Sequence, residues 1–266
     1  MPPERLQITL ILLHYGALRD TRECLHSLLA SRREPVPVIV VLNGAEGEVA
    51  SALRTEFPWT EVLVTGGNIG FAAGNNIGIR RALEDGASHI VLLNNDTVVE
   101  PGFLDSLAVV FCTYPEAGMV TGPVLHATPP NPIWSAGGKM GGWTALTRHS
   151  LVNQPRSALP QVVQETEYAN GCFVMVSRRC IETVGLMDEG YFLYYEDTDW
   201  CARVREAGFK MRKGTGRRRR GVSNMCMVQA RAWTIHMFDT PRLLRPVPFR
   251  ILKPASRTRA HQSVSS

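Results

Sequence analysis

The sequence predicts an α/β protein with a mostly parallel central sheet flanked by helices. Short apolar runs of strand length alternate with segments of helical periodicity along the first hundred residues. This alternation is typical of right-handed βαβ units and of nucleotide-type folds. One apolar run, Ile90 to Leu93, stops on the polar triplet Asn94-Asn95-Asp96. Because open α/β sheets bind ligands at the carboxyl ends of their strands, the triplet marks the expected site.

The expected elements follow from apolar periodicity in chain order. A buried strand is expected at residues 8–13, followed by a helix over 19–31 that Asp20 or Thr21 is expected to cap. The remaining expected elements are a strand at 36–42, a helix at 49–57 and strands at 60–64 and 90–93.

The polar triplet after the fourth expected strand supports two interpretations. The carboxylate of Asp96, flanked by the amides of Asn94 and Asn95, offers the oxygen ligands that Mg²⁺ prefers, commonly together with substrate phosphates. Alternatively, Asp96 caps the turn that precedes Pro101. The triplet by itself leaves both interpretations open.

A glycine-rich segment, residues 65–78, separates the third and fourth expected strands and holds five glycines and three asparagines around a helix start. Glycine lets backbone approach a ligand closely, and the amides of a helix N-terminus favour phosphate. The spacing is not that of the GxGxxG dinucleotide fingerprint. A turn that leads into an amphipathic helix is the alternative interpretation.

Three carboxylates, Glu196, Asp197 and Asp199, fall within four positions beside three tyrosines and a tryptophan. Repulsion and burial under aromatic rings predict a raised pKa for at least one carboxyl group, as a general base requires. The structural alternative is that acidic residues favour the first turn of a helix that runs to Ala207. Upstream, residues 168–177 predict a loop that enters another strand.

Composition and charge place limits on the class of protein. The apolar content of 44% is ordinary for a globular protein, and the first apolar run is too short for a membrane span or a convincing signal peptide. A cytoplasmic location is therefore expected. The six cysteines have no CxxC or zinc-like spacing, which indicates reduced thiols. Residues 1–210 hold 16 Lys and Arg against 23 Asp and Glu, whereas residues 211–266 hold 13 against 1, so a domain boundary is expected there.

Four segments together resemble family 2 glycosyltransferases of the GT-A fold, over about residues 6–210. They are His14-Tyr15, NIGFAAGNNIGI from residue 68, LLNNDTVV from residue 92 and MDEGYFLYYEDTDWCARVREAGFK from residue 187. The Asn-Asn-Asp form is most similar to rhamnosyltransferase-like enzymes of bacterial cell-surface polysaccharide assembly. The resemblance implies inverting, metal-dependent transfer of a sugar, with dTDP-rhamnose the favoured donor, to a glycan or lipid-linked acceptor.

The resemblance also implies roles for individual positions. Asp96 is expected to hold Mg²⁺ or Mn²⁺ against the donor diphosphate, with Asn94 and Asn95 beside it. Asp197 is expected to be the catalytic base, with Glu196 as its neighbour. The further residues implied are Asn68, Gly70 and Asn75 in the nucleotide-sugar pocket and Gly171 and Cys172 on the acceptor side.

The chain departs from the family pattern at two places. Leu42 stands where the family usually has an Asp that contacts the nucleotide base. The resemblance therefore indicates the sugar-transfer reaction more strongly than the identity of the nucleotide. After Lys210 the family continues with a strand, a turn and a histidine that completes the metal site. Here Trp233 and His236 match that element faintly, and His236 is the expected metal ligand.

The basic segment 211–266 leaves two hypotheses for function. The first is a sugar transferase that acts at the inner face of the plasma membrane, with a disordered or atypical tail. The second is a catalytically impaired homologue that binds nucleotide or an anionic surface through that tail. Nucleic-acid binding is not expected, because the run from Arg217 to Arg220 is short and poor in aromatic residues.

Overall fold

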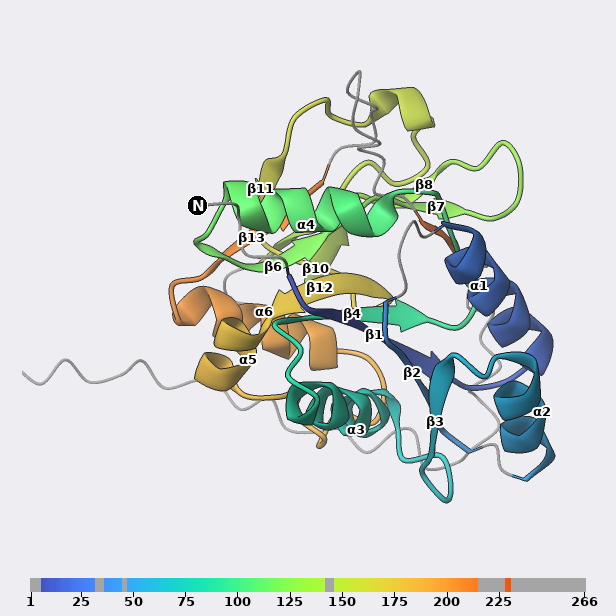
Figure 1. The fold of residues 1–266 in the computed structure, drawn as a ribbon. Helices are drawn as coiled ribbons and strands as arrows, with labels where there is room; N and C mark the ends of the chain where they lie inside the picture. The colour runs from blue at the N-terminus through green and yellow to red at the C-terminus, as the bar shows by residue number, and fades with distance from the viewer. Residues whose placement is uncertain (1–5, 32–35, 45–46, 142–145, 215–227, 231–266) are drawn as a thin grey trace, which may run out of the picture.

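The main structural unit is an eight-stranded mixed sheet with helices on both faces (Figure 1). The computed structural model describes residues 6–31, 36–44, 47–141, 146–214 and 228–230. Across the sheet, the strands are β11 (Gln164–Thr166), β13 (Lys210–Lys213), β6 (Ala117–Thr121), β12 (Phe173–Ser177), β4 (His89–Asn94), β1 (Ile8–His14), β2 (Val38–Leu42) and β3 (Thr60–Val64).

The four strands expected from the sequence form the parallel half of this sheet, which confirms the predicted fold class. β1 lies between β2 and β4, and β3 pairs with the outer edge of β2. Leu13 near the end of β1 is opposite Asn94 at the end of β4, and His14 is opposite Leu42 at the end of β2. The polar residues that follow β4 therefore emerge at the carboxyl edge of three neighbouring strands.

Two layers of helices cover the sheet, because successive residues of a strand point to opposite faces. Leu10 and Leu12 of β1 pack into one apolar core, and Ile11 and Leu13 pack into the other. Fully burying a side chain of this kind stabilises the fold by about 1.5–3 kcal/mol. Helices α1 (Leu18–Ser31), α2 (Glu48–Glu56) and α4 (Phe103–Thr113) contribute to the first core, and α3 (Phe71–Glu84), α5 (Arg178–Val184) and α6 (Glu196–Glu206) to the second (Figure 1).

Strand β12 joins the parallel half to the rest of the sheet. It runs antiparallel to both β4 and β6, and Phe173 is opposite Leu93. The loop that enters β12 consequently lies beside the end of β4. Two smaller sheets extend this edge: one contains β5 (Thr97–Val99), β14 (Val228–Ala230), β7 (Val124–His126) and β8 (Ile133–Ser135), and the other β9 (Gly138–Met140) and β10 (Thr147–His149).

Two expectations about element boundaries are corrected by the structure. Helix α1 begins at Leu18, so Asp20 and Thr21 lie inside its first turn and not at the N-cap position before it. Strand β13 continues to Lys213 and pairs with β6, so the boundary expected after Lys210 falls inside a strand of the main sheet. Beyond Gly214 the structure describes Val228–Ala230 alone, and the expected disorder of the rest of the tail lies outside the described residues.

Two features bear on the expectations drawn from composition. Cys24, Cys112, Cys172, Cys180 and Cys201 carry free thiols, and Cys112 is the exposed one among these five. Within the described ranges, no helix combines the length and the apolar character needed to cross a membrane.

Candidate active site

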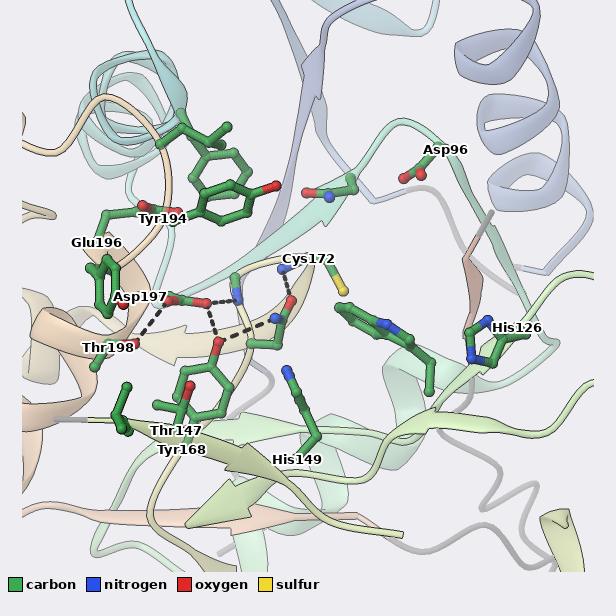
Figure 2. A pocket seen from close by; sticks show the side chains of 18 residues that line it. Asp96, His126, Thr147, His149, Tyr168, Cys172, Tyr194, Glu196, Asp197 and Thr198 are labelled. Atoms are coloured by element: carbon green, nitrogen blue, oxygen red, sulfur yellow. Dashed lines mark hydrogen bonds between the residues drawn. The ribbon is translucent and has the colours of Figure 1, made fainter. Parts of the chain in front are cut away.

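A cavity of about 570 Å³ opens at the carboxyl edge of the sheet, next to the end of β4 (Figure 2). Its wall is built from the turn after β4, the loop before β12, the start of α6 and aromatic residues of the smaller sheets. These segments are far apart in the sequence, and the antiparallel β12 brings them together. Six residues expected at the site line the cavity: Asn94, Asp96, Gly171, Cys172, Glu196 and Asp197.

The polar triplet divides between the cavity and the protein interior. Asn94 and Asp96 line the cavity, whereas the Asn95 side chain is 2% exposed and is not part of its wall. The Asn95 amide donates hydrogen bonds to the carbonyl of Tyr15, at 3.1 Å, and to the hydroxyl of Thr21, at 2.9 Å. Asn95 therefore fastens the turn that carries Asp96 to the start of α1.

The glycine-rich segment supports the site from behind the cavity wall. Asn68, Gly70 and Asn75 are not among the residues that line the cavity. The Asn68 carboxamide oxygen accepts a hydrogen bond from the Gly70 amide at 3.1 Å, and the Asn75 side chain donates to the carbonyl of Phe71 at 3.0 Å. These two hydrogen bonds lie within the segment that begins α3.

Gly70 cannot be replaced by another residue without strain. Its φ of 94° and ψ of 170° define a backbone conformation that is essentially restricted to glycine. A Cβ atom at this position would lie 2.6 Å from the carbonyl oxygen of Phe192. The same carbonyl accepts a hydrogen bond from the Phe71 amide at 2.7 Å. Gly70 therefore allows the start of α3 to pack directly against the loop that precedes α6.

Asn43, to which the sequence interpretation gave no role, connects the end of β2 to this segment. Its oxygen accepts a hydrogen bond from the Ile69 amide at 2.9 Å, and its amide donates to the Gly70 carbonyl and to Asn68, both at 3.1 Å. Asn43 is 1% exposed, and Leu42 is fully buried. Leu42 therefore offers no side-chain surface to a nucleotide base.

The acidic cluster occupies the first turn of α6, as the helix-based interpretation of the sequence expected. Its three carboxylates do not share one environment. Asp199 forms an ion pair with Arg203 at 2.8 Å and does not line the cavity, whereas Glu196 and Asp197 both do. Tyr195, directly before the helix, has a φ of 70°, which lies in the left-handed region. The chain therefore turns sharply just before Glu196 and Asp197, which line the cavity.

Among the carboxyl groups of the site, Glu196 has the most strongly shifted pKa. It is 5% exposed, and its Oε2 atom is buried without a hydrogen-bond partner among the described residues. Burial, followed by the negative charge of Asp197, raises the pKa of Glu196 to about 8. Glu196 therefore carries a proton at neutral pH, and the expected pKa shift in the acidic cluster falls on this residue.

Asp197 is held by groups from the loop that enters β12. Its Oδ2 atom accepts hydrogen bonds from the Tyr168 hydroxyl at 2.5 Å and from the Gly171 amide at 3.2 Å. Tyr168 falls in the segment 168–177, for which the sequence predicts a loop that enters a strand but no role for this side chain. The signal that identifies it is spatial, because the two residues are 29 positions apart.

Cys172 lies within electrostatic reach of both aspartates. It is 6% exposed, and burial, followed by the negative charges of Asp96 and Asp197, raises the pKa of its thiol well above the usual value. Because the thiolate is the nucleophilic form of cysteine, this residue is an inert part of the wall. Asp96, Cys172 and Asp197 line the same cavity.

Aromatic residues of the smaller sheets complete the wall opposite α6. The His149 ring packs against Trp134, with centroids 5.1 Å apart, and against Tyr168, at 5.4 Å. Its Nδ1 atom is hydrogen-bonded to the Ser135 hydroxyl at 2.8 Å. Burial lowers the pKa of His149, and the charge of Asp197 partly opposes that shift. An uncharged imidazole therefore faces the cavity at neutral pH.

The described residues contain no group of three or more His, Cys, Asp or Glu side chains placed to hold a metal ion. Asp96 provides one carboxylate on the cavity wall, with the carboxamide of Asn94 nearby. Mg²⁺ is commonly held by one or two carboxylates together with substrate phosphates, so this donor set fits a cation that arrives with a diphosphate. His236, the other expected ligand, lies outside the described residues.

Comparisons with known proteins identify the family to which this chain is similar. The profile of the glycosyltransferase-like family 2 matches residues 4–224. The dTDP-rhamnosyl transferase RfbF of Shigella flexneri is 24% identical over 184 residues, which cover 69% of this chain and 59% of that protein. The N-acetylglucosaminyl-diphospho-decaprenol L-rhamnosyltransferase of Mycobacterium tuberculosis is 24% identical over 204 residues, covering 70% of this chain and 66% of that protein. The chain thus spans less than two thirds of the length of these relatives.

A solved structure supports the assignment of the fold. The crystal structure of GalNAc-T7 with UDP, GalNAc and Mn²⁺ superposes with a TM-score of 0.65 at 12% sequence identity, over 85% of this chain and 44% of that one. An identity this low identifies the fold alone, and that fold is GT-A. With the family profile covering most of its length, the chain belongs to glycosyltransferase family 2.

Proposed function

We propose that this chain transfers a sugar, with rhamnose favoured, from a nucleotide-diphosphate donor to a cell-surface polysaccharide or lipid-linked acceptor, with inversion at the anomeric carbon. Membership of family 2 supports sugar transfer in general. The choice of dTDP-rhamnose and of a lipid-linked acceptor rests on the names of the two rhamnosyltransferase relatives. A lipid-linked acceptor would bring the protein to the inner face of the plasma membrane.

The observation that carries this proposal is that Asp96 and Asp197 line one cavity from opposite sides of Cys172 (Figure 2). Sugar transfer requires a site that binds the diphosphate of the donor and a base that faces the acceptor hydroxyl. Asp96 stands at the carboxyl end of the central strand, where α/β sheets bind ligands. Asp197 stands on the other side, next to the acceptor loop that contains Gly171.

In the proposed reaction Asp197 accepts the proton of the acceptor hydroxyl as its oxygen attacks the anomeric carbon. The bond between that carbon and the diphosphate oxygen breaks in the same displacement, and the nucleoside diphosphate leaves with the bonding electrons. Glu196 stays protonated at neutral pH, so it adds no second negative charge beside the base. The thiol of Cys172 likewise stays protonated at neutral pH, so it does not compete with Asp197 for the proton.

Asp96, with Asn94 beside it, would hold a divalent cation against the donor diphosphate. Bound there, Mg²⁺ or Mn²⁺ would offset the negative charge of the departing diphosphate. We propose that Asn95 contributes by fixing the turn, and that Asn68, Gly70 and Asn75 shape the donor side through the loop that begins α3.

The test is hydrolysis of nucleotide sugars, because it needs no knowledge of the acceptor. The full chain is incubated with a panel that includes dTDP-rhamnose, with Mg²⁺ or Mn²⁺ or with EDTA, and released nucleoside diphosphate is measured. We expect release from dTDP-rhamnose that EDTA abolishes and that Asp96→Asn loses. Asp105→Asn, an exposed carboxylate in the first turn of α4, is the matched control and should keep full activity.

Two results would contradict the proposal. Metal-independent release, unaffected by Asp96→Asn, would remove the cation from the mechanism. The protein could also bind a donor but neither hydrolyse any member of the panel nor transfer its sugar to any supplied acceptor. That result would favour the alternative of a catalytically impaired homologue that binds nucleotide.

A further inference from the structure

The hydroxyl of Tyr168 is buried between an amide and the carboxylate of Asp197. Tyr168 is 4% exposed, its oxygen accepts a hydrogen bond from the Asn170 amide at 3.2 Å, and its proton points to Asp197 Oδ2 at 2.5 Å. Burial, followed by the charge of Asp197, raises the pKa of Tyr168 far above the usual value for a phenol. The hydroxyl therefore keeps its proton at neutral pH and remains a hydrogen-bond donor.

The two oxygens of Asp197 differ in their partners, as the dashed lines of Figure 2 show. Oδ2 receives both the Tyr168 hydroxyl and the Gly171 amide. Oδ1 has a single, long hydrogen bond of 3.4 Å from the Thr198 hydroxyl among the described residues. Because hydrogen bonds to a charged oxygen are strong, the saturated Oδ2 is fixed in place and Oδ1 is the oxygen left to take a proton.

The loop that supplies these donors is itself tied to the central strand. The Asn170 side chain accepts a hydrogen bond from the Cys172 amide at 2.8 Å, and the Cys172 carbonyl accepts one from the Asn94 amide at 3.0 Å. Tyr168 thus connects the carboxylate on α6 to the end of β4, where Asp96 follows. Through this chain of contacts the position of Asp197 is set relative to the donor side of the cavity.

We propose that Tyr168 is a positioning residue for the base of the sugar transfer: it holds Asp197 Oδ2, so that Oδ1 faces the acceptor hydroxyl and takes its proton. This inference rests on the proposed function. In the step, the acceptor oxygen forms its bond to the anomeric carbon, its proton moves to Oδ1, and the diphosphate leaves with the electrons of the broken bond. Tyr168 contacts neither substrate and keeps its own proton throughout.

The experiment compares the pH dependence of kcat in the wild type and in Tyr168→Phe, with dTDP-rhamnose as donor. Loss of a hydrogen bond to the carboxylate should lower kcat about 10-fold to 100-fold and move the acid limb of the profile to higher pH, because a hydrogen bond that favours the charged form is removed. The donor KM should change less than about threefold, because the hydroxyl does not touch the donor. The titratable groups on which the charge of Asp197 acts are His149, Tyr168, Cys172, Glu196 and Cys201.

The matched control is Tyr114→Phe, which removes a phenol hydroxyl at the end of α4, outside the cavity. It should leave both kcat and the acid limb unchanged. A second measurement adds Tyr168→Phe to Asp197→Asn. If Tyr168 acts through Asp197, the double variant should be no slower than Asp197→Asn alone, whereas a purely structural role would make the two losses add.

The outcomes separate this inference from the proposed function. A wild type without transfer or hydrolysis would defeat the proposed function itself. An active wild type that loses turnover in Asp197→Asn, but whose kcat and acid limb are unchanged in Tyr168→Phe, would overturn the positioning role alone. Should Tyr168→Phe not fold, Asn170→Ala carries the test, because it leaves the phenol but removes the amide that orients it. Its acid limb should move in the same direction, and an unchanged limb would overturn the proposal.

Discussion

Replacing Glu196 with Gln should change how the stability of this protein depends on pH. Gln has the shape of a protonated Glu but cannot ionise. In the folded wild type, burial and the neighbouring Asp197 raise the pKa of Glu196 from 4.5 to about 8. The unfolded chain releases this proton at much lower pH than the folded chain does. The wild type should therefore lose stability, relative to the variant, as the pH rises from about 4.5 to about 8.

The size of the effect follows from the shift of this pKa. Each pH unit between the unfolded and folded pKa values corresponds to about 1.4 kcal/mol. Glu196 is 5% exposed, so solvent screens this difference little. Between pH 5.5 and pH 8, the free energy of unfolding of the wild type should fall by about 3 kcal/mol relative to Glu196→Gln. Above about pH 8 the folded wild type also ionises, and the difference should level off.

The assay is urea unfolding of both proteins at a series of pH values, followed by circular dichroism. Other titrating groups are common to the two proteins, so their contributions cancel in the difference. Glu206→Gln, an exposed position at the other end of α6, is the matched control and should stay within about 0.5 kcal/mol of the wild type at every pH. Parallel curves for the wild type and Glu196→Gln would refute the conclusion that Glu196 is protonated at neutral pH.

Three further substitutions test other parts of the site. Asp96→Asn should weaken donor binding at least about tenfold in the presence of Mg²⁺ or Mn²⁺, measured by calorimetric titration, with thermal unfolding little changed; equal affinity with and without metal in the wild type would contradict this. Asp197→Asn should lower turnover about 10²-fold to 10⁴-fold with donor affinity nearly unchanged, and full activity would exclude it as the base. Gly70→Ala should lower the free energy of unfolding by about 1–3 kcal/mol, because its φ of 94° and the Phe192 carbonyl leave no room for a Cβ atom; an equally stable variant would show that this loop relaxes freely.

The parallel half of the fold was predictable because its signals are local. β1, β2 and β4 are mainly apolar runs buried on both faces, whereas the edge strand β3 is buried at Val62 alone, and the breaks between the strands coincide with glycine, asparagine or proline. Asn94 ends β4 and Asp96 lies two residues beyond it, so their place at the carboxyl edge needed no knowledge of distant contacts. The first turn of α6 was predictable for the same reason, since acidic residues concentrate at its start.

The wall formed by the smaller sheets was not predictable from the sequence. Its strands are three residues long, too short for an alternating pattern to be distinguished from a loop. The partners of Asn95 were not predictable either, because a carboxamide at the end of a strand can form hydrogen bonds with a ligand or with a neighbouring carbonyl group. Its actual partners, Tyr15 and Thr21, are set by the packing of α1 against the turn.

The two neighbouring carboxyl groups of α6 have different surroundings. Glu196 is buried with an oxygen that has no hydrogen-bond partner among the described residues, and desolvation favours its neutral form. Asp197 accepts hydrogen bonds from Tyr168 and Gly171, which favour the charged form. Since two adjacent charges in a partly buried site repel each other, protonation of Glu196 removes this repulsion from the site. In solvent both carboxyl groups would be ionised at neutral pH. The base of the proposed reaction therefore depends on the hydrogen-bond donors of the loop before β12 as much as on the acidic first turn of α6.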